Sequence, residues 1–264
     1  TDRNLTGSDV AFPYTVTENV DFYAKYVADY IVTYNLDGGS WSANPRTLYA
    51  AGDMVTVASE QPQKVGYEFA GWKKSGESIV QPGGIFSMPE ADVTLTAQWT
   101  PRTDLSYTVN YYLLKESSLG EPLLALEPAV DENGDPIKVW PSYVERDITC
   151  GTSVTARAVS VTGYKLANGV ADTRELTIDR DTHVVKVYYV ANDQNLVVNW
   201  VDETGTVLKN AESTPVKYDF KYDVSDQRSA SLVGPDGKTY VYDSTEGDVT
   251  GIVKGDVKVT FTYA

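Results

Sequence analysis

Cysteine and histidine are almost absent from this sequence, which contains one residue of each among its 264. Cys150 therefore cannot form an internal disulfide, and no second soft ligand lies near it in the sequence to complete a metal site. His183 also stands alone, without the serine or cysteine motif that would accompany a histidine base in nucleophilic catalysis. We therefore predict no catalytic residues and no cofactor, and we expect His183 to lie at the surface or at a sheet edge.

Long apolar runs and clusters of basic residues are lacking as well. No stretch of about 18 consecutive apolar residues occurs, so nothing in the sequence predicts a membrane-spanning helix. The net charge is -15 at pH 7, and lysine and arginine are scattered among acidic residues, whereas phosphate recognition needs them clustered. The sequence thus argues against a nucleic-acid partner and against an anionic membrane surface. It begins without a signal-peptide pattern, and we interpret it as a fragment of a longer protein.

What the sequence has in quantity is strict alternation of apolar and polar residues, the pattern of a half-buried strand. Four recurring segments of this kind end on an aromatic residue, at residues 20–26, 93–99, 183–189 and 257–263, and the third is apolar on both faces apart from Lys186. Each follows a short acidic segment rich in turn-forming residues, for example Pro89-Glu90-Ala91-Asp92. We therefore predict that each closing strand is the second arm of a hairpin.

Opening strands recur soon after the first three closing segments, at residues 30–34, 107–111 and 196–200. This fixed order, with a period of roughly 70 to 90 residues, predicts an array of similar modules. We place the end of a preceding repeat at 1–28 and modules at 29–101, 102–191 and 192–264. The predicted fold class is mainly β, a β-rich α+β class of small tandem modules in an elongated array. The two best candidates for short helices are residues 59–64 and 217–227, although Pro62 limits the first.

Four motifs stand in order in the first complete module: Val32-Thr33-Tyr34-Asn35-Leu36-Asp37-Gly38-Gly39, Gly52-Asp53-Met54-Val55, Gly66-Tyr67-Glu68-Phe69-Ala70-Gly71-Trp72, and Met88-Pro89-Glu90-Ala91-Asp92-Val93-Thr94-Leu95-Thr96-Ala97-Gln98-Trp99. With these motifs, residues 30–100 resemble the Listeria–Bacteroides repeat, the B repeat of internalin-like surface proteins. Residues 10–27 look like the closing part of a preceding B repeat.

A second resemblance rests on Asn199-Trp200-Val201-Asp202-Glu203-Thr204-Gly205-Thr206-Val207-Leu208. This stretch, and the two later modules with it, resemble the mucin-binding-protein (MucBP) repeat. The modules depart from that pattern, because residues 115–146 are longer than it predicts and the last module lacks the Gly-Tyr pair seen at Gly163-Tyr164. The two resemblances imply a β-grasp-like fold for each module, an extracellular location on a Gram-positive cell surface, and a role in adhesion or as a spacer. They imply no catalytic residues.

The five tryptophans divide by their sequence context. Trp72, Trp99 and Trp200 stand in the module motifs, and we expect them in the cores because aromatic residues dominate small cores. Trp41 and Trp140 lie in loop-like sequence, the latter close to Tyr143. Exposed aromatic residues can stack on sugar rings or anchor a protein partner, so the candidate ligand-binding residues are Trp140, Tyr143 and Trp41. Packing of these residues between modules is the alternative.

One segment imitates the start of a calcium loop. Asp131, Asn133 and Asp135 have the required spacing, but Pro136 stands where such a loop needs glycine and Ser142 where it needs glutamate. An Asn-Gly hairpin turn is the simpler interpretation, and calcium the weaker one.

From these features we predict a non-catalytic, monomeric repeat segment of a bacterial cell-surface protein, acting as an extended stalk or adhesin region. Two alternatives remain open. The later modules could recognise host mucin glycans or a host glycoprotein, or the chain could be an accessory region of a large surface enzyme.

Overall fold

The computed structural model describes residues 15, 17–19, 28–119 and 125–264. The chain divides into two compact units, Thr1–Arg102 and Thr103–Ala264, which are described separately below. The closing strand predicted at residues 20–26, and most of the segment predicted at 1–28, lie outside the described residues.

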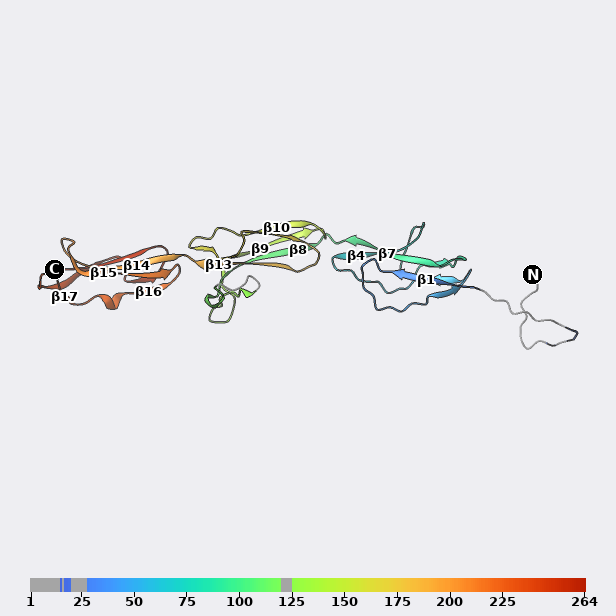
Figure 1. Cartoon of the computed structure of the whole chain (residues 1–264), viewed down its shortest axis with the longest axis horizontal. Helices are drawn as coiled ribbons and strands as arrows, with labels where there is room; N and C mark the ends of the chain where they lie inside the picture. Colours follow the sequence, from blue (N-terminus) through green and yellow to red (C-terminus); the bar gives the residue numbers. More distant parts are fainter. Residues whose placement is uncertain (1–14, 16, 20–27, 120–124) are drawn as a thin grey trace. The chain divides into compact units, whose positions relative to one another are not determined.

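The first unit contains a five-stranded sheet and a two-stranded sheet (Figure 1). In the larger sheet the order is β2-β1-β7-β4-β5, and the opening strand β1 runs parallel to the closing strand β7. In the smaller sheet β3 pairs with β6. The strands are β1 (Asp29–Asn35), β2 (Leu48–Ala50), β3 (Met54–Thr56), β4 (Tyr67–Lys74), β5 (Ile79–Val80), β6 (Ile85–Ser87) and β7 (Val93–Pro101).

The second unit contains two such arrangements in succession, which we call the second and third modules; the first unit holds the first module. The second module has a sheet of order β11-β13-β8-β9 and the pair β10-β12. Its elements are β8 (Leu105–Leu113), the 3-10 helix η1 (Glu116–Ser118), β9 (Lys138–Ile148), β10 (Ser153–Arg157), β11 (Tyr164–Leu166), β12 (Thr173–Thr177) and β13 (His183–Ala191).

The third module has a sheet of order β15-β14-β20-β18-β17 and the pair β16-β19. Its elements are β14 (Asp193–Asp202), β15 (Val207–Lys217), β16 (Lys221–Asp223), the 3-10 helix η3 (Ser225–Gln227), β17 (Ser231–Val233), β18 (Thr239–Glu246), β19 (Thr250–Ile252) and β20 (Val257–Tyr263).

All three modules share one topology. The opening and closing strands lie side by side and parallel, as β1 with β7, β8 with β13 and β14 with β20, and antiparallel strands flank each pair. This is the strand order of a β-grasp sheet, and a two-stranded sheet accompanies it in every module. The prediction of a mainly β fold built from small tandem modules is therefore confirmed.

The helices expected at residues 59–64 and 217–227 are wrong, since no α-helix occurs among the described residues. Around the first segment, Gln63 and Ser40 exchange two backbone hydrogen bonds of 2.8 and 2.9 Å, which hold the chain in an extended bridge. In the second segment β16 pairs with β19, and only the 3-10 turn η3 remains. Non-local pairing has thus overridden a weak local helical preference.

The expectation of hairpins before the closing strands is also wrong. The strand that precedes each closing strand pairs elsewhere, as β6 does with β3 and β19 with β16. The acidic approach residues instead accept a hydrogen bond from the opening strand. The Ile31 N–H donates to Asp92 Oδ1 and the Asn195 N–H to Asp256 Oδ1, both at 2.8 Å. These carboxylates satisfy an opening-strand N–H beside the parallel pair.

Each core is formed by the alternating apolar residues of the central strands. In the first module Trp72 is fully buried and Trp99 is partly buried against the same core. In the third, Trp200 packs with Phe261 and its Nε1 donates to the Gln227 carbonyl at 3.1 Å.

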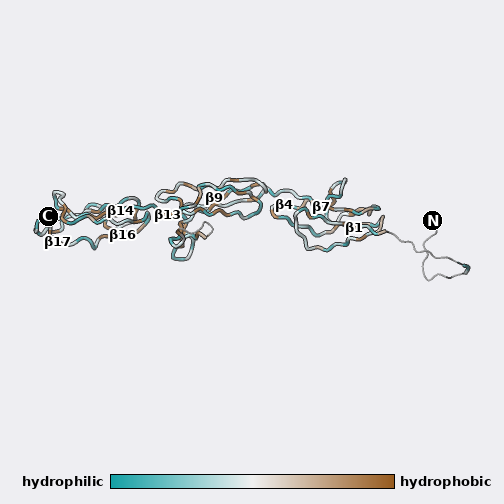
Figure 2. The backbone as a smooth tube through the Cα atoms, in the orientation of Figure 1, coloured by the Kyte–Doolittle hydropathy of each residue, from teal (hydrophilic) through white to brown (hydrophobic). Residues whose placement is uncertain are grey.

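Hydrophobic residues are dispersed along the chain rather than gathered in one run (Figure 2), and no described helix is long and apolar enough to cross a membrane.

The second module is unusual because its sheet is covered on both faces. Alternate residues of β13 such as Val185 and Val187 are buried on one face. On the other face Tyr188 and Tyr112 pack with Leu126, whose carbonyl accepts a 2.8 Å hydrogen bond from the Tyr188 hydroxyl. Leu126 belongs to the long insertion between β8 and β9. This second apolar face explains why the sequence of β13 is apolar at nearly every position.

Candidate functional site

The candidate ligand residues Trp140 and Tyr143 both lie on β9, the edge strand of the second module, and are 47% and 49% exposed. The Tyr143 hydroxyl donates to Glu145 Oε2 at 3.2 Å, and the Tyr107 hydroxyl donates to the same oxygen at 2.8 Å. The nearby Glu145 charge raises the pKa of Tyr143. Trp140 and Tyr143 are therefore both available at the surface, and Tyr143 is held by the Glu145 carboxylate.

Trp41 lies apart from these residues, in the core of the first module. Its ring packs 5.1 Å from that of Tyr34 and 5.3 Å from that of Trp72, measured between ring centroids. Its Nε1 is buried and has no hydrogen-bond partner in the protein. Trp41 thus occupies the position of a core residue within its own module.

The segment proposed as a weak calcium candidate forms a tight turn. Asp131 Oδ1 accepts hydrogen bonds from the backbone N–H groups of Asn133 and Asp135, at 2.9 and 3.0 Å. The Gly134 N–H donates to the Asp131 carbonyl at 3.1 Å. The Asp131 carboxylate is therefore engaged by its own turn. Among the residues that the structure describes, no group of three or more histidine, cysteine or acidic side chains could hold a metal ion.

Cys150 and His183 take separate places in the second module. Cys150 is buried and unpaired. His183 begins β13, and its Nε2 lies 2.8 Å from Asp179 Oδ1. Hydrogen bonds to Asp179 from Arg180 and then from His183 lower the pKa of that carboxyl to about 2. His183 thus contacts a surface carboxylate that also pairs with Arg180.

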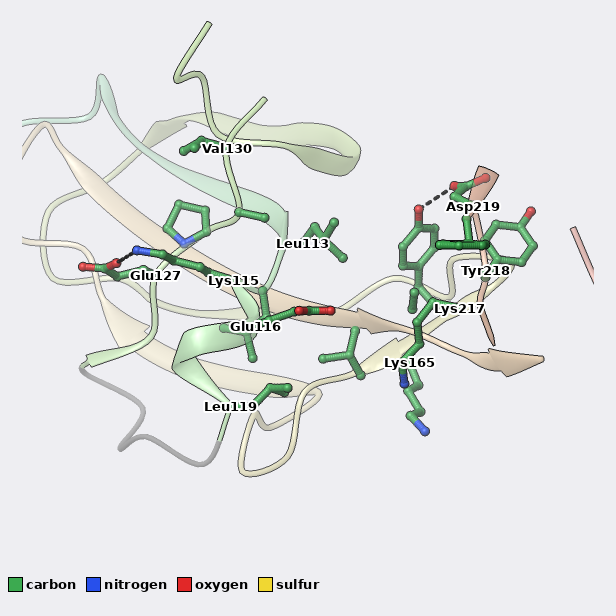
Figure 3. A pocket seen from close by; sticks show the side chains of 17 residues that line it. Leu113, Lys115, Glu116, Leu119, Glu127, Val130, Lys165, Lys217, Tyr218 and Asp219 are labelled. Atoms are coloured by element: carbon green, nitrogen blue, oxygen red, sulfur yellow. Dashed lines mark hydrogen bonds and ion pairs between the residues drawn. The ribbon is translucent and has the colours of Figure 1, made fainter. Parts of the chain in front are cut away.

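Side chains of the second and third modules contact each other where these two modules meet, within the second compact unit. The Tyr164 hydroxyl donates to Asp219 Oδ2 at 2.6 Å, and Lys254 binds the other oxygen of that carboxylate. The Tyr164 and Tyr218 rings pack edge to face with centroids 5.5 Å apart. In Figure 3 a dashed line marks this hydrogen bond at Asp219, and Tyr218 is labelled close to it. We call these four residues and Gly163 the junction cluster.

The backbone passes through the junction cluster with its polar groups satisfied. A single residue, Asn192, separates β13 from β14. Its N–H donates to the Gly163 carbonyl at 2.8 Å, and its carbonyl accepts from the Tyr218 N–H at 2.9 Å. Gly163 has φ +83°, and a Cβ at this position would lie 2.3 Å from the Tyr218 ring. Glycine is therefore required here by both conformation and space.

The charges of the junction cluster stabilise one another. Burial raises the pKa of the Tyr164 phenol, and the hydrogen bond to Asp219 raises it further. Burial by itself raises the pKa of Asp219, but hydrogen bonds from Lys254 and Tyr164 lower it by more, so that its pKa lies below the usual value. The bond to Asp219 also raises the pKa of Lys254. Tyr164 therefore stays neutral, and its two partners stay charged, at neutral pH.

A groove of about 970 Å³ lies beside the junction cluster. Its walls come from the ends of β8 and β13, from the insertion after β8, and from the loop after β15 (Figure 3). Phe220 and Leu119 line it and are 49% and 60% exposed. Lys165 and Lys217 lie at its edge and both pair with Asp193. The groove therefore combines an apolar lining with paired charges.

Sequence reasoning identified Gly163-Tyr164 as a repeated motif but not as part of a joint between modules. The matching pair Gly66-Tyr67 has the same backbone role, since the Gly66 carbonyl accepts the Arg102 N–H at 3.0 Å just after β7. The signal that could have found the joint is this pairing of Gly-Tyr with the residue after each closing strand. Its partners Tyr218 and Asp219 carried no recognisable pattern.

The sequence matches one family model, described as the Listeria–Bacteroides repeat domain, over residues 30–98. No curated protein matches the chain. Among solved structures, domains 3–4 of the Streptococcal High Identity Repeats in Tandem (SHIRT) from a cell surface protein are 16% identical, with a TM-score of 0.19, covering 62% of this chain and 98% of that one. The Bacillus anthracis TIE protein is 10% identical, with a TM-score of 0.30, covering 89% of this chain and 49% of that one.

Both TM-scores lie below 0.5, so no functional inference rests on these two structures. The chain spans about half the length of the TIE protein. The family match confirms the first of the two resemblances noted in the sequence and does not extend to the second. Residues 30–98 thus match a repeat of the Listeria–Bacteroides type.

Proposed function

We propose that this chain is a stalk segment of a bacterial cell-surface protein, exposed outside a Gram-positive cell wall and working as a monomer under tension. The proposal extends the family match at residues 30–98 to the later modules, whose MucBP-like motifs suggest the same setting. The observation that carries it is the parallel pairing of opening and closing strands in every module.

This pairing determines how a module responds to a pulling force. The force enters at the start of the opening strand and leaves at the end of the closing strand. Because the two strands are parallel neighbours, these points lie at opposite ends of the ladder, and the force shears all its hydrogen bonds together. An antiparallel hairpin would instead open one bond at a time. The topology therefore suits a protein that must transmit tension without unfolding.

The parallel ladder of the first module is shorter than those of the other two modules. The β1–β7 pairing runs over four registered pairs, from Val32↔Val93 to Asn35↔Thr96. The β8–β13 and β14–β20 pairings each run over seven. The first module should therefore yield at a lower force than the other two.

Single-molecule force spectroscopy on the whole chain, pulled from both termini, tests this function. We expect the first unfolding event to occur in the first module, and every event to extend the chain by roughly 3.5 Å per released residue. As a control, the third module is pulled through Gln194→Cys and Gly255→Cys in a Cys150→Ser background. These residues lie at the same end of the β14–β20 ladder, so the force should unzip it. If both geometries gave the same low unfolding force, the stalk function would be wrong.

A second proposed function is ligand recognition, and one observation favours it. The candidate ligands are host mucin glycans and a host glycoprotein. The groove beside the junction cluster offers the exposed ring of Phe220 together with lysine and aspartate side chains. Apolar and aromatic side chains together with a few placed polar groups are typical of small-molecule binding sites.

A mucin and glycan array separates this function from the spacer role. If the groove binds glycans, Phe220→Ala should reduce binding at least tenfold and Trp140→Ala should leave it unchanged. The reverse pattern would place the site on β9 at Trp140 and Tyr143. Absence of binding by the unmodified chain would contradict recognition by this segment and leave the stalk function untouched.

A further inference from the structure

The second module has an open sheet edge at a position where the first and third modules each have a paired strand of their own. In the first module β4 pairs with β7 as far as Lys74↔Leu95, and in the third β18 pairs with β20 as far as Glu246↔Thr260. In the second, β11 is three residues long and reaches only Leu166↔Tyr189. Beyond that point, no strand among the described residues pairs with the outer side of β13.

The backbone groups at this edge can be identified from the alternation of the strand. The Tyr188 carbonyl accepts the Ala167 N–H at 2.9 Å, so residue 188 directs its backbone groups toward the β11 side. Alternate residues of a strand direct their backbone N–H and C=O groups toward the same neighbouring strand. Lys186 and Val184 therefore present their N–H and C=O groups to the open edge, whereas Val185 and Val187 direct theirs toward β8.

A cavity of about 510 Å³ runs along this edge. One wall is β13 from Val184 to Tyr188, and the other includes the start of β12 with Arg174. Ala156 and Val185 on its lining are 2% and 5% exposed, whereas Val184 is 54% exposed. The cavity is thus an apolar trough bordered by unpaired strand backbone, with Lys186 and Arg174 at its rim.

We infer that this edge, residues 183–188 of β13, binds an extended peptide segment of another protein by strand addition. An added strand antiparallel to β13 would take the place that Trp72–Lys74 occupy beside β7 in the first module. Main-chain hydrogen bonds would supply affinity, and alternate side chains would supply selectivity. The residue opposite Lys186 would be acidic, and its neighbours, on the side of Val185 and Val187, would be small and apolar.

A second copy of this chain fits the edge poorly. Two copies paired edge to edge and antiparallel would bring their Lys186 side chains together, and like charges on neighbouring strands oppose pairing. Each copy also carries a net charge of -15, so the chains repel one another. The occupant is therefore a different polypeptide with an apolar–acidic–apolar core. This inference does not depend on the stalk function.

Two pentapeptides with blocked ends, Thr-Val-Glu-Val-Thr and Thr-Val-Lys-Val-Thr, test the proposal. Binding is measured by titration calorimetry, and protection of the amides of residues 184 and 186 by hydrogen exchange. We expect the glutamate peptide to bind the whole chain and protect both amides. Lys186→Glu should weaken binding of the glutamate peptide about three- to tenfold. The same variant should bind the lysine peptide more tightly, because the surface charge pair is reversed.

Val184→Pro is the second variant, since proline is tolerated on a strand edge and removes the N–H that faces the trough. This variant should weaken the binding of both peptides about tenfold, as expected for one lost hydrogen bond. Circular dichroism should show that its fold is retained. Absence of protection at millimolar peptide would overturn the proposal, as would binding that neither variant changes. Concentration-dependent dimerisation that protects the same amides without peptide would also overturn it, in favour of a second copy.

Discussion

Replacing Trp72 with alanine is expected to lower the free energy of unfolding of the first module by about 3–5 kcal/mol, the usual cost of removing a large buried aromatic side chain. Trp72 is fully buried, and its ring lies within 5.3 Å of those of Tyr34, Trp41 and Phe69. A small domain is stabilised by only about 5–15 kcal/mol in total. The variant should therefore leave the first module near its unfolding threshold at room temperature.

Hydrogen exchange in increasing urea measures this effect strand by strand. Amides of β1 and β7 should lose protection at lower urea in Trp72→Ala, and those of β14 and β20 should be unchanged. Trp140→Ala is the matched control, because this tryptophan is 47% exposed and should cost no more than about 0.5 kcal/mol. An equal loss of protection in both compact units would contradict the division at residues 102 and 103.

Replacing Gly163 with valine is expected to break the junction cluster. A non-glycine residue at φ +83° costs about 1–2 kcal/mol, and overpacking against the Tyr218 ring adds about 1–3 kcal/mol. The least costly response is displacement of Tyr218, which also removes its edge-to-face contact with Tyr164. We expect the second and third modules to unfold together in the natural protein and separately in the variant.

Gly169→Val separates the two contributions. Gly169 has φ +80°, but a Cβ there meets nothing within 4 Å, so the variant carries the backbone strain without the steric conflict. Urea midpoints are followed by exchange of β8 and β20 amides. Coincident midpoints in Gly169→Val and divergent midpoints in Gly163→Val would support the junction as a mechanical coupling. Divergent midpoints already in the natural protein would show that the modules are independent and that the cluster does not couple them.

The local strand pattern was largely predictable from the sequence. The segments at 93–99, 183–189 and 257–263 are β7, β13 and β20 or parts of them, and the opening segments lie within β1, β8 and β14. Trp72 and Trp200 were expected in cores and are buried there. These predictions succeed because alternation with a period of two is imposed on each strand by burial of one face, which leaves its record in consecutive residues.

The pairing of these strands could not be predicted in the same way. Turn-rich approaches suggested hairpins, yet each closing strand pairs in parallel with a distant opening strand, as Val257 does with Leu196 and His183 with Tyr107. The acidic residues of two approaches serve that long-range contact, as Asp92 and Asp256 show. Partners so distant leave no local pattern. The prediction of the candidate site from the sequence was similarly incomplete, because Gly163-Tyr164 was visible as a motif while Tyr218 and Asp219 were not.

The sequence by itself thus determined that the chain is a mainly β array of repeated modules, because core burial and turn formation depend on neighbouring residues. Tertiary structure alone decided three further features. It joined Tyr164 to Asp219, it covered the second face of the β8–β13 sheet with Leu126, and it left the edge of β13 at Val184 and Lys186 open. Each depends on which segments meet in space, and contacts between distant residues are selected by packing and hydrogen-bond satisfaction over the whole fold.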